Sequence, residues 1–338
     1  MRKILIITLL LATSWSANSN WFSPFSVGEY DESRVENGTT LFSYNYNKKS
    51  PRMIEVNMDG DVVWEYYIPE SMLQRGSILM DVERLENGNT LFNVKYSGIY
   101  EIDSKGSVVW KHLDSKTSHD IDRLPNGNTI YVRAWVNKGD SHVVEVNSAG
   151  DIVWQWDGLR EFDVLPYSNV EREGWMHVNA VTRFEDESTL ISLRNLQMVI
   201  RVDSDGDVVW KQTFNCRKAE KKWNLGHKKS LKGCNPHEAE ISEDGNILIT
   251  ATRHPDVVYQ LDVESGEQIW KWHGGTSQRI RDADRLPNGN ILIQDNNKLI
   301  EVAPNKDVVW TLNAKNLQWR SDNIKAGVAL YKAQRIVD

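Results

Sequence analysis

The chain has 338 residues, with 40 basic side chains against 47 acidic ones and a formal net charge of −7. This negative balance argues against nucleic acid as a partner. The length would suit two average domains, but repeat folds of this size often form one domain.

The first 17 residues have the pattern of a signal peptide. Arg2 and Lys3 precede an apolar run from Ile4 to Ala12, and small residues follow as far as Ala17. Such a run is too short to span a bilayer, so we expect cleavage after Ser16 or Ala17. No cysteine lies near that point to carry a lipid. The sequence therefore predicts a periplasmic or secreted protein without a membrane anchor.

The remaining residues, 18–338, repeat one short phrase six times: a turn, a few mostly apolar residues, then tryptophan. The spacings between the tryptophans are 46, 44, 56, 60 and 40 residues. A period of about 40–50 residues with strand-like content is typical of a radial array of small sheets. We assign these tryptophans a structural role between neighbouring sheets, because a large ring fills that wedge. They are Trp64, Trp110, Trp154, Trp210, Trp270 and Trp310.

The third copy shows the full unit of four strands. The predicted strands are His119–Leu124, Thr129–Arg133, His142–Asn147 and Ile152–Trp156. An Asn126-Gly127 hairpin turn joins the first two, and all other copies but the fourth have a similar turn. The fourth, Glu185–Ser188, reads as two residues longer. Six copies predict an all-β, six-bladed β-propeller with four antiparallel strands per blade, formed by 18–338 as one domain.

How the ring closes is left open by the sequence. Either Trp21–Val27 or Ala326–Val337 has the apolar content to complete an open edge. Two connections between blades are long, Asp157–Met176 and Lys211–Pro236, and lead to histidines, which is typical of pocket walls. Variation of surface loops is the alternative explanation.

Both cysteines, Cys216 and Cys234, lie in the second long connection. Export makes a disulfide between them plausible. In the loop-entropy treatment, closing a separation of this size stabilises the fold by roughly 3 kcal/mol. Two free thiols are the alternative.

The first strand of each blade should lie nearest the propeller axis. Counting back from the end of each hairpin turn gives one equivalent residue per blade. A single histidine there is most simply a satisfied core residue, but three in six equivalent places indicate a functional site, since histidine makes up only 8 of 338 residues. The six residues are Tyr30, Met80, His119, His177, His237 and Arg281.

Arginines end the second strands on the same face as these histidines. They are Arg133, Arg194 and Arg253, and strand alternation leaves open which of them point inward. We assign Arg253, Arg281, Tyr30 and Met80 to substrate binding. The histidines outside this register are assigned to the surface or to packing: His112, His142, His227, His254 and His273.

Three histidines with an arginine make a cavity rich in hydrogen-bond donors. It lacks the carboxylates that calcium or magnesium needs and suits an oxyanion such as sulfate or phosphate. A neutral imidazole can act as a nucleophile, and protonated imidazoles with guanidinium can stabilise the oxygens of a transferring group. A zinc site of three histidines is the competing interpretation. A nearby arginine disfavours it, and we expect no metal or other cofactor.

These residues resemble the arylsulfate sulfotransferase family. Its members are exported six-bladed propellers that move a sulfuryl group from an aryl sulfate to a phenol without a nucleotide sulfate. The repeat phrases Leu-Pro-Asn-Gly-Asn and Gly-Asp-Val-Val-Trp are moderately specific. More specific are His119-Asp-Ile, His177-Val-Asn-Ala-Val followed by Arg194, and His237-Glu-Ala.

The resemblance implies a role for each of these residues. His237 matches the nucleophile, which forms a transient sulfohistidine, while His119, His177 and Arg194 match the groups that hold the sulfuryl oxygens. One of those histidines also acts as acid or base toward the phenol. The family carries a disulfide shortly before the nucleophile, which Cys216 and Cys234 would provide.

Two features depart from the family pattern. Well-known members have an additional N-terminal β-domain that assists dimerisation, and this chain has little sequence before its first blade, so its oligomeric state stays open. The nucleophile is also set in Asn-Pro-His-Glu, which is not its usual surrounding. Two other functions compete with sulfuryl transfer: a non-catalytic scaffold of the cell envelope, and a metal-dependent propeller hydrolase or lyase.

Overall fold

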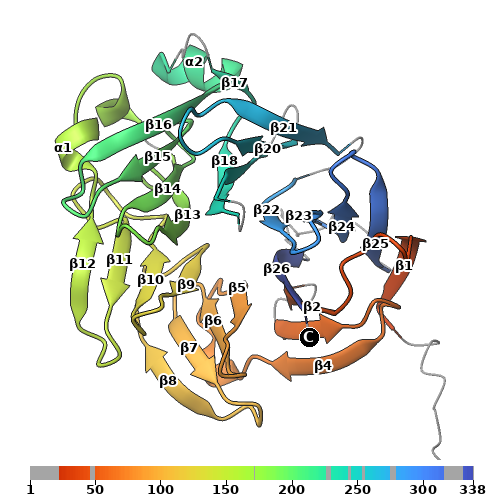
Figure 1. Cartoon of the computed structure of the whole chain (residues 1–338). Helices are drawn as coiled ribbons and strands as arrows, with labels where there is room; N and C mark the ends of the chain where they lie inside the picture. The colour runs from red at the N-terminus through yellow and green to blue at the C-terminus, as the bar shows by residue number, and fades with distance from the viewer. Residues whose placement is uncertain are drawn as a thin grey trace, which may run out of the picture.

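A computed structural model describes residues 23–45, 50–170, 172–225, 230–242, 245–252, 256–274, 279–315 and 330–337. They form six sheets around a central axis, each with four antiparallel strands, which confirms the predicted six-bladed β-propeller (Figure 1). The expected signal peptide lies outside the described residues. Within these ranges, no helix has the length and apolar character needed to cross a bilayer.

Blades 2 to 5 are each built from four consecutive strands. Blade 2 consists of β5 (Leu79–Arg84), β6 (Thr90–Val94), β7 (Gly98–Ile102) and β8 (Val108–His112). Blade 3 consists of β9 (Ile121–Arg123), β10 (Thr129–Val132), β11 (Val143–Val146) and β12 (Ile152–Trp156). Blade 4 consists of β13 (Val178–Arg183), β14 (Thr189–Leu193), β15 (Met198–Val202) and β16 (Val208–Asn215), and blade 5 of β18 (Pro236–Ile241), β19 (Ile247–Ala251), β20 (Val257–Leu261) and β21 (Gln268–His273).

The short remaining elements lie in connections between blades. The strand β17 (Leu231–Lys232) pairs in parallel with β16. The helical turns are η1 (Glu70–Met72), α1 (Leu159–Phe162), η2 (Tyr167–Asn169) and α2 (Arg217–Trp223).

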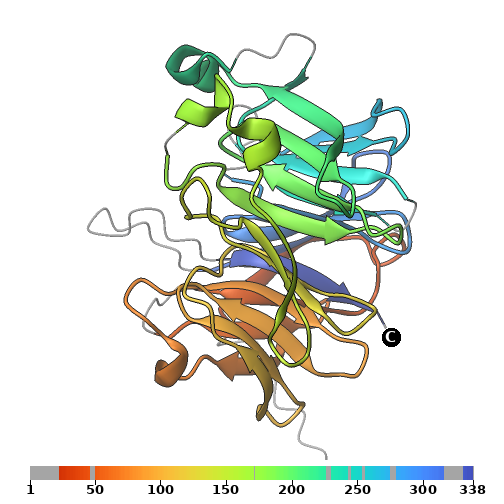
Figure 2. The same cartoon turned by 90° about the vertical axis from the view of Figure 1, so that its left-hand side faces the viewer.

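Both predicted closing segments contribute to the ring. Blade 1 consists of β2 (Thr39–Tyr44), β3 (Arg52–Val56), β4 (Val62–Tyr67) and, as its inner strand, β26 (Leu330–Ile336). Blade 6 consists of β22 (Asp282–Arg285), β23 (Ile291–Asp295), β24 (Lys298–Val302) and β25 (Val308–Ala314), with β1 (Phe25–Tyr30) added outside β25. The C-terminal strand therefore closes the ring. In the side view β26, in dark blue, crosses the middle of the molecule (Figure 2).

The prediction that Tyr30 lies at the axis is wrong. Tyr30 ends β1 on the outer edge of blade 6, where it pairs with Trp310 and is 40% exposed. The counting assumed that the inner strand of blade 1 precedes its hairpin turn in the sequence. That strand instead comes from the other end of the chain, and Tyr331 takes the axial place.

The repeated tryptophans join neighbouring blades, as expected from the sequence. Trp110 Nε1 donates to Ser148 O in the next blade at 2.9 Å. Arg123, from the inner strand of that blade, lies over the Trp110 ring at 5.0 Å and pairs with Glu101 at 2.8 Å. The same indole-to-carbonyl bond is made by Trp154, Trp270 and Trp310, and the same ion pair joins Arg84 to Glu55, Arg183 to Glu145 and Arg335 to Glu301.

Candidate functional site

A bulge in the inner strands determines what reaches the axis. In β18 the pairing with β19 moves from Pro236↔Ala251 to Ala239↔Ile249, so two residues face one on the partner strand. This lets His237 and its neighbour Glu238 both contact β26, through Tyr331 and Lys332. The equivalent bulge in β5 falls on Met80 and Asp81, and Met80 is buried there. Each such strand thus supplies two consecutive axial layers.

The structure brings His119, His177 and His237 together in the first of these layers. The ring centroid of His119 lies 5.2 Å from that of His177 and 5.7 Å from that of His237. Burial, reinforced by neighbouring imidazole or cationic side chains, holds the pKa of all three well below 6.5. At neutral pH the cluster therefore consists of neutral imidazoles rather than protonated ones.

Strand pairing corrects the placement of His177. In blade 4, Arg183 pairs with Thr189 across the hairpin at the spacing found in blade 2, so the fourth turn has no extra residues. The residue equivalent to His237 is therefore Asn179, whose Oδ1 is buried without a hydrogen-bond partner among the described atoms. His177 lies two residues earlier, with a positive φ of 52°.

Arg194 joins the cluster through His177. Arg194 Nη1 lies 3.1 Å from His177 Nε2, and His177 Nδ1 lies 2.8 Å from Glu173 O. These partners assign the tautomer: Nδ1–H donates to the carbonyl, and Nε2 accepts from the guanidinium. The Nε2 lone pair is thus not open to zinc. In the described part of the chain, no group of three His, Cys, Asp or Glu side chains is placed to hold a metal ion.

The other predicted arginines do not all reach the site. Arg133 makes a 2.7 Å ion pair with Asp114 and none with the cluster. Arg253 lies outside the described residues. Arg281 is buried one residue before β22, and its Cζ lies 5.7 Å from the Tyr331 ring centroid. Burial lowers the pKa of Arg281 to about 10, so it stays cationic at neutral pH.

Tyr331 is a site residue that counting along the sequence missed. Its hydroxyl lies 3.1 Å from His237 Nε2, and the ring centroids are 5.7 Å apart. Burial raises the Tyr331 pKa well above 10, so the phenol keeps its proton. The sequence does contain a sign that this segment is an inner strand. Tyr331-Lys-Ala-Gln-Arg335 repeats the spacing of the inner-strand segment Arg281-Asp-Ala-Asp-Arg285.

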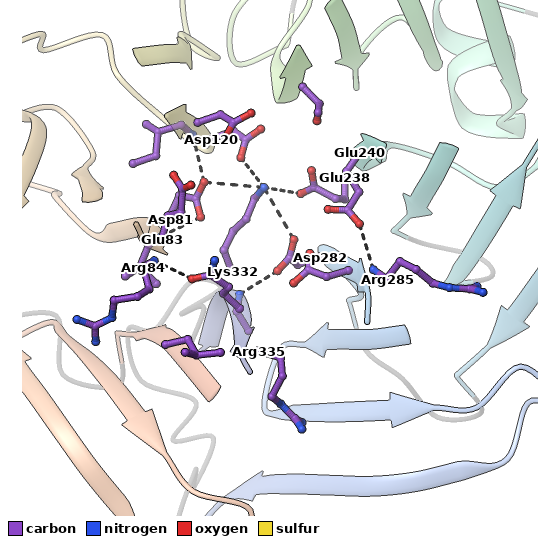
Figure 3. A pocket seen from close by; sticks show the side chains of 18 of the residues that line it. Asp81, Glu83, Arg84, Asp120, Glu238, Glu240, Asp282, Arg285, Lys332 and Arg335 are labelled. Atoms are coloured by element: carbon purple, nitrogen blue, oxygen red, sulfur yellow. Dashed lines mark hydrogen bonds and ion pairs between the residues drawn. The ribbon is translucent and has the colours of Figure 1, made fainter. Parts of the chain in front are cut away.

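An ionic cluster fills the next layer of the axis. Lys332 Nζ pairs with Asp120 and lies 2.7 Å from Glu238, 3.8 Å from Asp282 and 4.0 Å from Asp81 (Figure 3). These carboxylates come from four blades, so one ammonium ties them all to the closing strand. The cluster also lines a cavity of about 870 Å³, to which none of the histidines contributes. Sequence reasoning did not anticipate this cluster.

A further layer of carboxylates faces the same cavity. Glu83, Asp122, Glu240 and Asp284 line it. Burial, reinforced by the neighbouring carboxylates, raises the pKa of all four, to about 8 for Glu83 and about 7 for Asp122. At neutral pH most of these carboxyls therefore keep their protons, and this mouth of the axis gains negative charge only as pH rises.

We expect the unfolding temperature to fall as pH rises from about 6.5 to 8. In this window the native state still holds protons on carboxyls such as Glu83, whereas the unfolded chain has lost them near pH 4. Their stabilising contribution is complete at low pH and is lost as pH passes their raised native pKa values. The buried histidines, with lowered pKa values, act in the opposite direction only below about pH 6.5.

Calorimetry of Glu83→Gln measures this effect. The amide keeps an acceptor for the Arg123 backbone N–H, which Glu83 binds at 3.3 Å. The variant should unfold at a higher temperature than the wild type at pH 9 and show a flatter pH dependence. Glu264→Gln, on the exposed surface, is the matched control. Identical slopes for Glu83→Gln and the wild type would refute the assignment.

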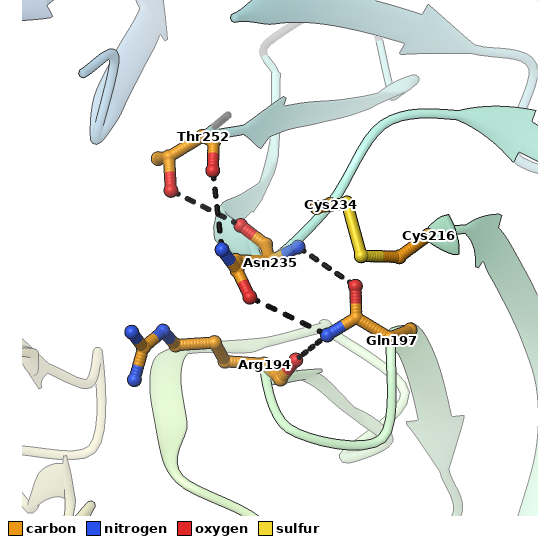
Figure 4. The surroundings of a disulfide bond; sticks show 6 residues. All are labelled: Arg194, Gln197, Cys216, Cys234, Asn235 and Thr252. Atoms are coloured by element: carbon orange, nitrogen blue, oxygen red, sulfur yellow. Dashed lines mark hydrogen bonds between the residues drawn. A yellow bond between two sulfur atoms is a disulfide. The ribbon is translucent and has the colours of Figure 1, made fainter. Parts of the chain in front are cut away.

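The predicted disulfide between Cys216 and Cys234 is present, with a Cα–Cα distance of 4.8 Å. Cys234 precedes Asn235, whose N–H donates to Gln197 Oε1 at 2.9 Å (Figure 4). Gln197 Nε2 in turn donates to the Arg194 carbonyl at 2.6 Å. The bridge therefore fixes the segment leading into β18 to the residue that follows β16, and these hydrogen bonds join the same segment to the turn that carries Arg194.

Comparison with known proteins identifies a family for this chain. The profile of the family described as Arylsulfotransferase (ASST) matches residues 26–298. No curated protein matches the chain.

Solved structures show the same architecture. A protein of unknown function from Bacteroides caccae superposes with a TM-score of 0.63 at 17% identity, covering 89% of this chain and 100% of that one. A catalytically inactive virginiamycin B lyase from Staphylococcus aureus with quinupristin superposes with a TM-score of 0.53 at 13% identity, covering 87% of this chain and 90% of that one. A streptogramin B lyase superposes with a TM-score of 0.52 at 12% identity, covering 85% of this chain and 86% of that one. At these identities the similarity concerns the propeller fold alone.

Proposed function

Because the chain belongs to the arylsulfotransferase family, we propose that it moves a sulfuryl group from an aryl sulfate to a phenolic acceptor without a nucleotide sulfate. One observation carries the proposal: neutral imidazoles from three blades meet guanidinium groups at one end of the axis. The side chains that meet there are cationic and neutral donors, which suit an anionic group with three equivalent oxygens.

His237 is the proposed nucleophile. Its Nε2 is bonded to Tyr331, and its Nδ1 has no partner among the described atoms. The neutral ring carries one proton and one lone pair, and the lone pair attacks sulfur. The N–S bond forms as the bond from sulfur to the aryl oxygen breaks, and the phenolate leaves. The acceptor phenol then loses its proton and attacks the same sulfur, which breaks the N–S bond and restores His237.

The remaining groups act on the oxygens around sulfur. Arg194 and Arg281 supply positive charge, and their fields at His237 already help to keep that imidazole neutral. His119 Nδ1 is also without a partner among the described atoms. We assign neutral His119 as the base that takes the proton from the acceptor phenol and passes it to solvent, while the first phenolate leaves unprotonated and takes its proton from water. His177, held by Glu173 O, positions Arg194.

The disulfide and the family both bear on the compartment. A disulfide persists in oxidising surroundings, and together with the family it indicates a location outside the cytoplasm. We propose that residues 1–17 direct export and that the mature protein is periplasmic or secreted.

The test is a transfer assay with a coloured aryl sulfate donor and a phenol acceptor, run with and without a chelator. We expect release of the coloured phenolate together with formation of the acceptor sulfate, both unaffected by chelation, because the chemistry uses side chains alone. Loss of turnover on chelation would favour a metal-dependent hydrolase or lyase. No turnover across a broad donor panel would favour a non-catalytic scaffold.

A further inference from the structure

Lys95 occupies the same register in blade 2 as Arg194 does in blade 4. Each lies five residues after the threonine that begins its second strand, Thr90 in β6 and Thr189 in β14. Second strands end on the face where inner strands begin. Lys95 is therefore a further cation beside the histidine cluster, in addition to Arg194 and Arg281, and the proposed reaction does not use it.

Aromatic rings connect Lys95 to the cluster. Lys95 Nζ lies 3.9 Å from the Trp135 ring centroid and 4.4 Å from that of Tyr96. The Trp135 ring centroid in turn lies 4.5 Å from that of His119 and 5.4 Å from that of His177. The ammonium thus sits one indole ring away from the imidazoles. Its charge helps to lower the pKa of both histidines, which supports this proximity.

Lys95 is held by rings rather than by a carboxylate. Arg194 pairs with Glu173 at 3.3 Å, but no ion pair of Lys95 with a carboxylate is found in the described ranges. Tyr96 beside it is 37% exposed and has a φ of 65°, a costly conformation for a tyrosine. A cation over aromatic faces keeps its N–H donors directed to the side, where a ligand anion can meet them.

We propose that Lys95 and Trp135 form a subsite for the aryl part of the substrate and select aromatic rings that carry a second anionic substituent, such as a carboxylate or sulfonate. This rests on the proposed function, because it places the transferred sulfuryl group at the imidazoles. A ring bonded to that group stacks on Trp135, which contacts two of the three histidines. A negative substituent on the far side of the ring then meets the Lys95 ammonium.

Binding of two phenols of similar shape tests the proposal without turnover. By calorimetry, the wild-type protein should bind 4-hydroxybenzoate about tenfold more tightly than 4-hydroxybenzamide, as one charge-assisted contact allows. Lys95→Met should bind the two equally, and Lys95→Arg should keep the preference. High salt should reduce the preference of the wild type for the benzoate, because it screens the charge of Lys95. Lys105→Met, an exposed lysine in the β7–β8 turn, is the matched control and should bind like the wild type.

The outcomes separate the two proposals. Equal affinity of the wild type for both phenols, no binding of either, or an unchanged preference in Lys95→Met would overturn the subsite. Tighter binding of the benzoate together with no sulfuryl transfer from any donor would support the subsite and refute the transferase. With the corresponding donors, 4-carboxyphenyl and 4-carbamoylphenyl sulfate, the ratio of kcat/KM values should fall about tenfold in Lys95→Met.

Discussion

Replacing His237 with alanine should lower sulfuryl transfer by roughly 10⁴-fold or more, because it removes the atom that forms the N–S bond. No other imidazole replaces it: His177 Nε2 is held by Arg194, and the His119 ring is 5.7 Å away between centroids. The fold should persist, since among the described atoms the Tyr331 hydroxyl is the ring's one hydrogen-bond partner. The measurement is kcat/KM from release of a coloured phenolate, alongside the unfolding temperature.

A matched substitution separates chemistry from packing. His142 is fully buried, packs against Trp175 with centroids 5.8 Å apart, and lies outside the cluster. His142→Ala should lower the unfolding temperature yet retain transfer per folded molecule. With donor alone, a peptide carrying His237 should gain the mass of one SO₃ group in the wild type. Transfer that survives in His237→Ala would remove this residue as the nucleophile.

Local features of the sequence were enough to predict the six blades. The tryptophan phrase and the Asn-Gly turn recur within each unit, and each fixes a hairpin over a few residues. Ring closure has no such local signal. β2 pairs with β26, so that Thr40 lies opposite Arg335 almost at the other end of the chain. The placement of Tyr30 failed for this reason.

Site residues could be predicted where their place follows from counting back from a recognisable hairpin turn. His119 and His237 were placed correctly because an Asn-Gly or Asp-Gly turn marks the end of their strands. The irregular turn of blade 4 gave no such mark, and Asn179 was missed as the axial residue. Successive side chains of a strand point to opposite sides, so a shift of one residue decides whether an arginine faces inward. Arg133 and Arg194 differ by one such residue, and only Arg194 contacts the histidine cluster.

The acidic residues of the ionic cluster were also visible in the sequence. Asp81, Asp120, Glu238 and Asp282 each directly follow an axial position. Four buried carboxylates at one axis would repel one another strongly, so the pattern requires a cation. That cation, Lys332, is supplied by the closing strand, and its role became visible only with the ring closed.

Replacing Lys332 with methionine should lower the free energy of unfolding by about 3–5 kcal/mol, because it leaves buried carboxylates without their partner. Methionine keeps most of the aliphatic volume, so the loss is electrostatic. Burial already raises the pKa of Asp81, Glu238 and Asp282, and Lys332 opposes that rise. Without it, these groups fold only in the protonated form. The deficit should therefore grow as pH rises from 5 to 8 and narrow in acid, where both proteins carry protonated carboxyls.

Compensating variants locate the effect. Lys332→Met combined with Glu238→Gln should recover part of the lost stability, because one unpaired charge is removed, whereas Lys111→Met on the exposed face of β8 should change little. The ammonium also fastens β26 to carboxylates of four blades. Hydrogen exchange in Lys332→Met should accordingly accelerate first in β26 and β2, the pair that closes the ring. Uniform acceleration across all six blades, or wild-type stability, would mean that closure depends on Arg335 and strand pairing and not on Lys332.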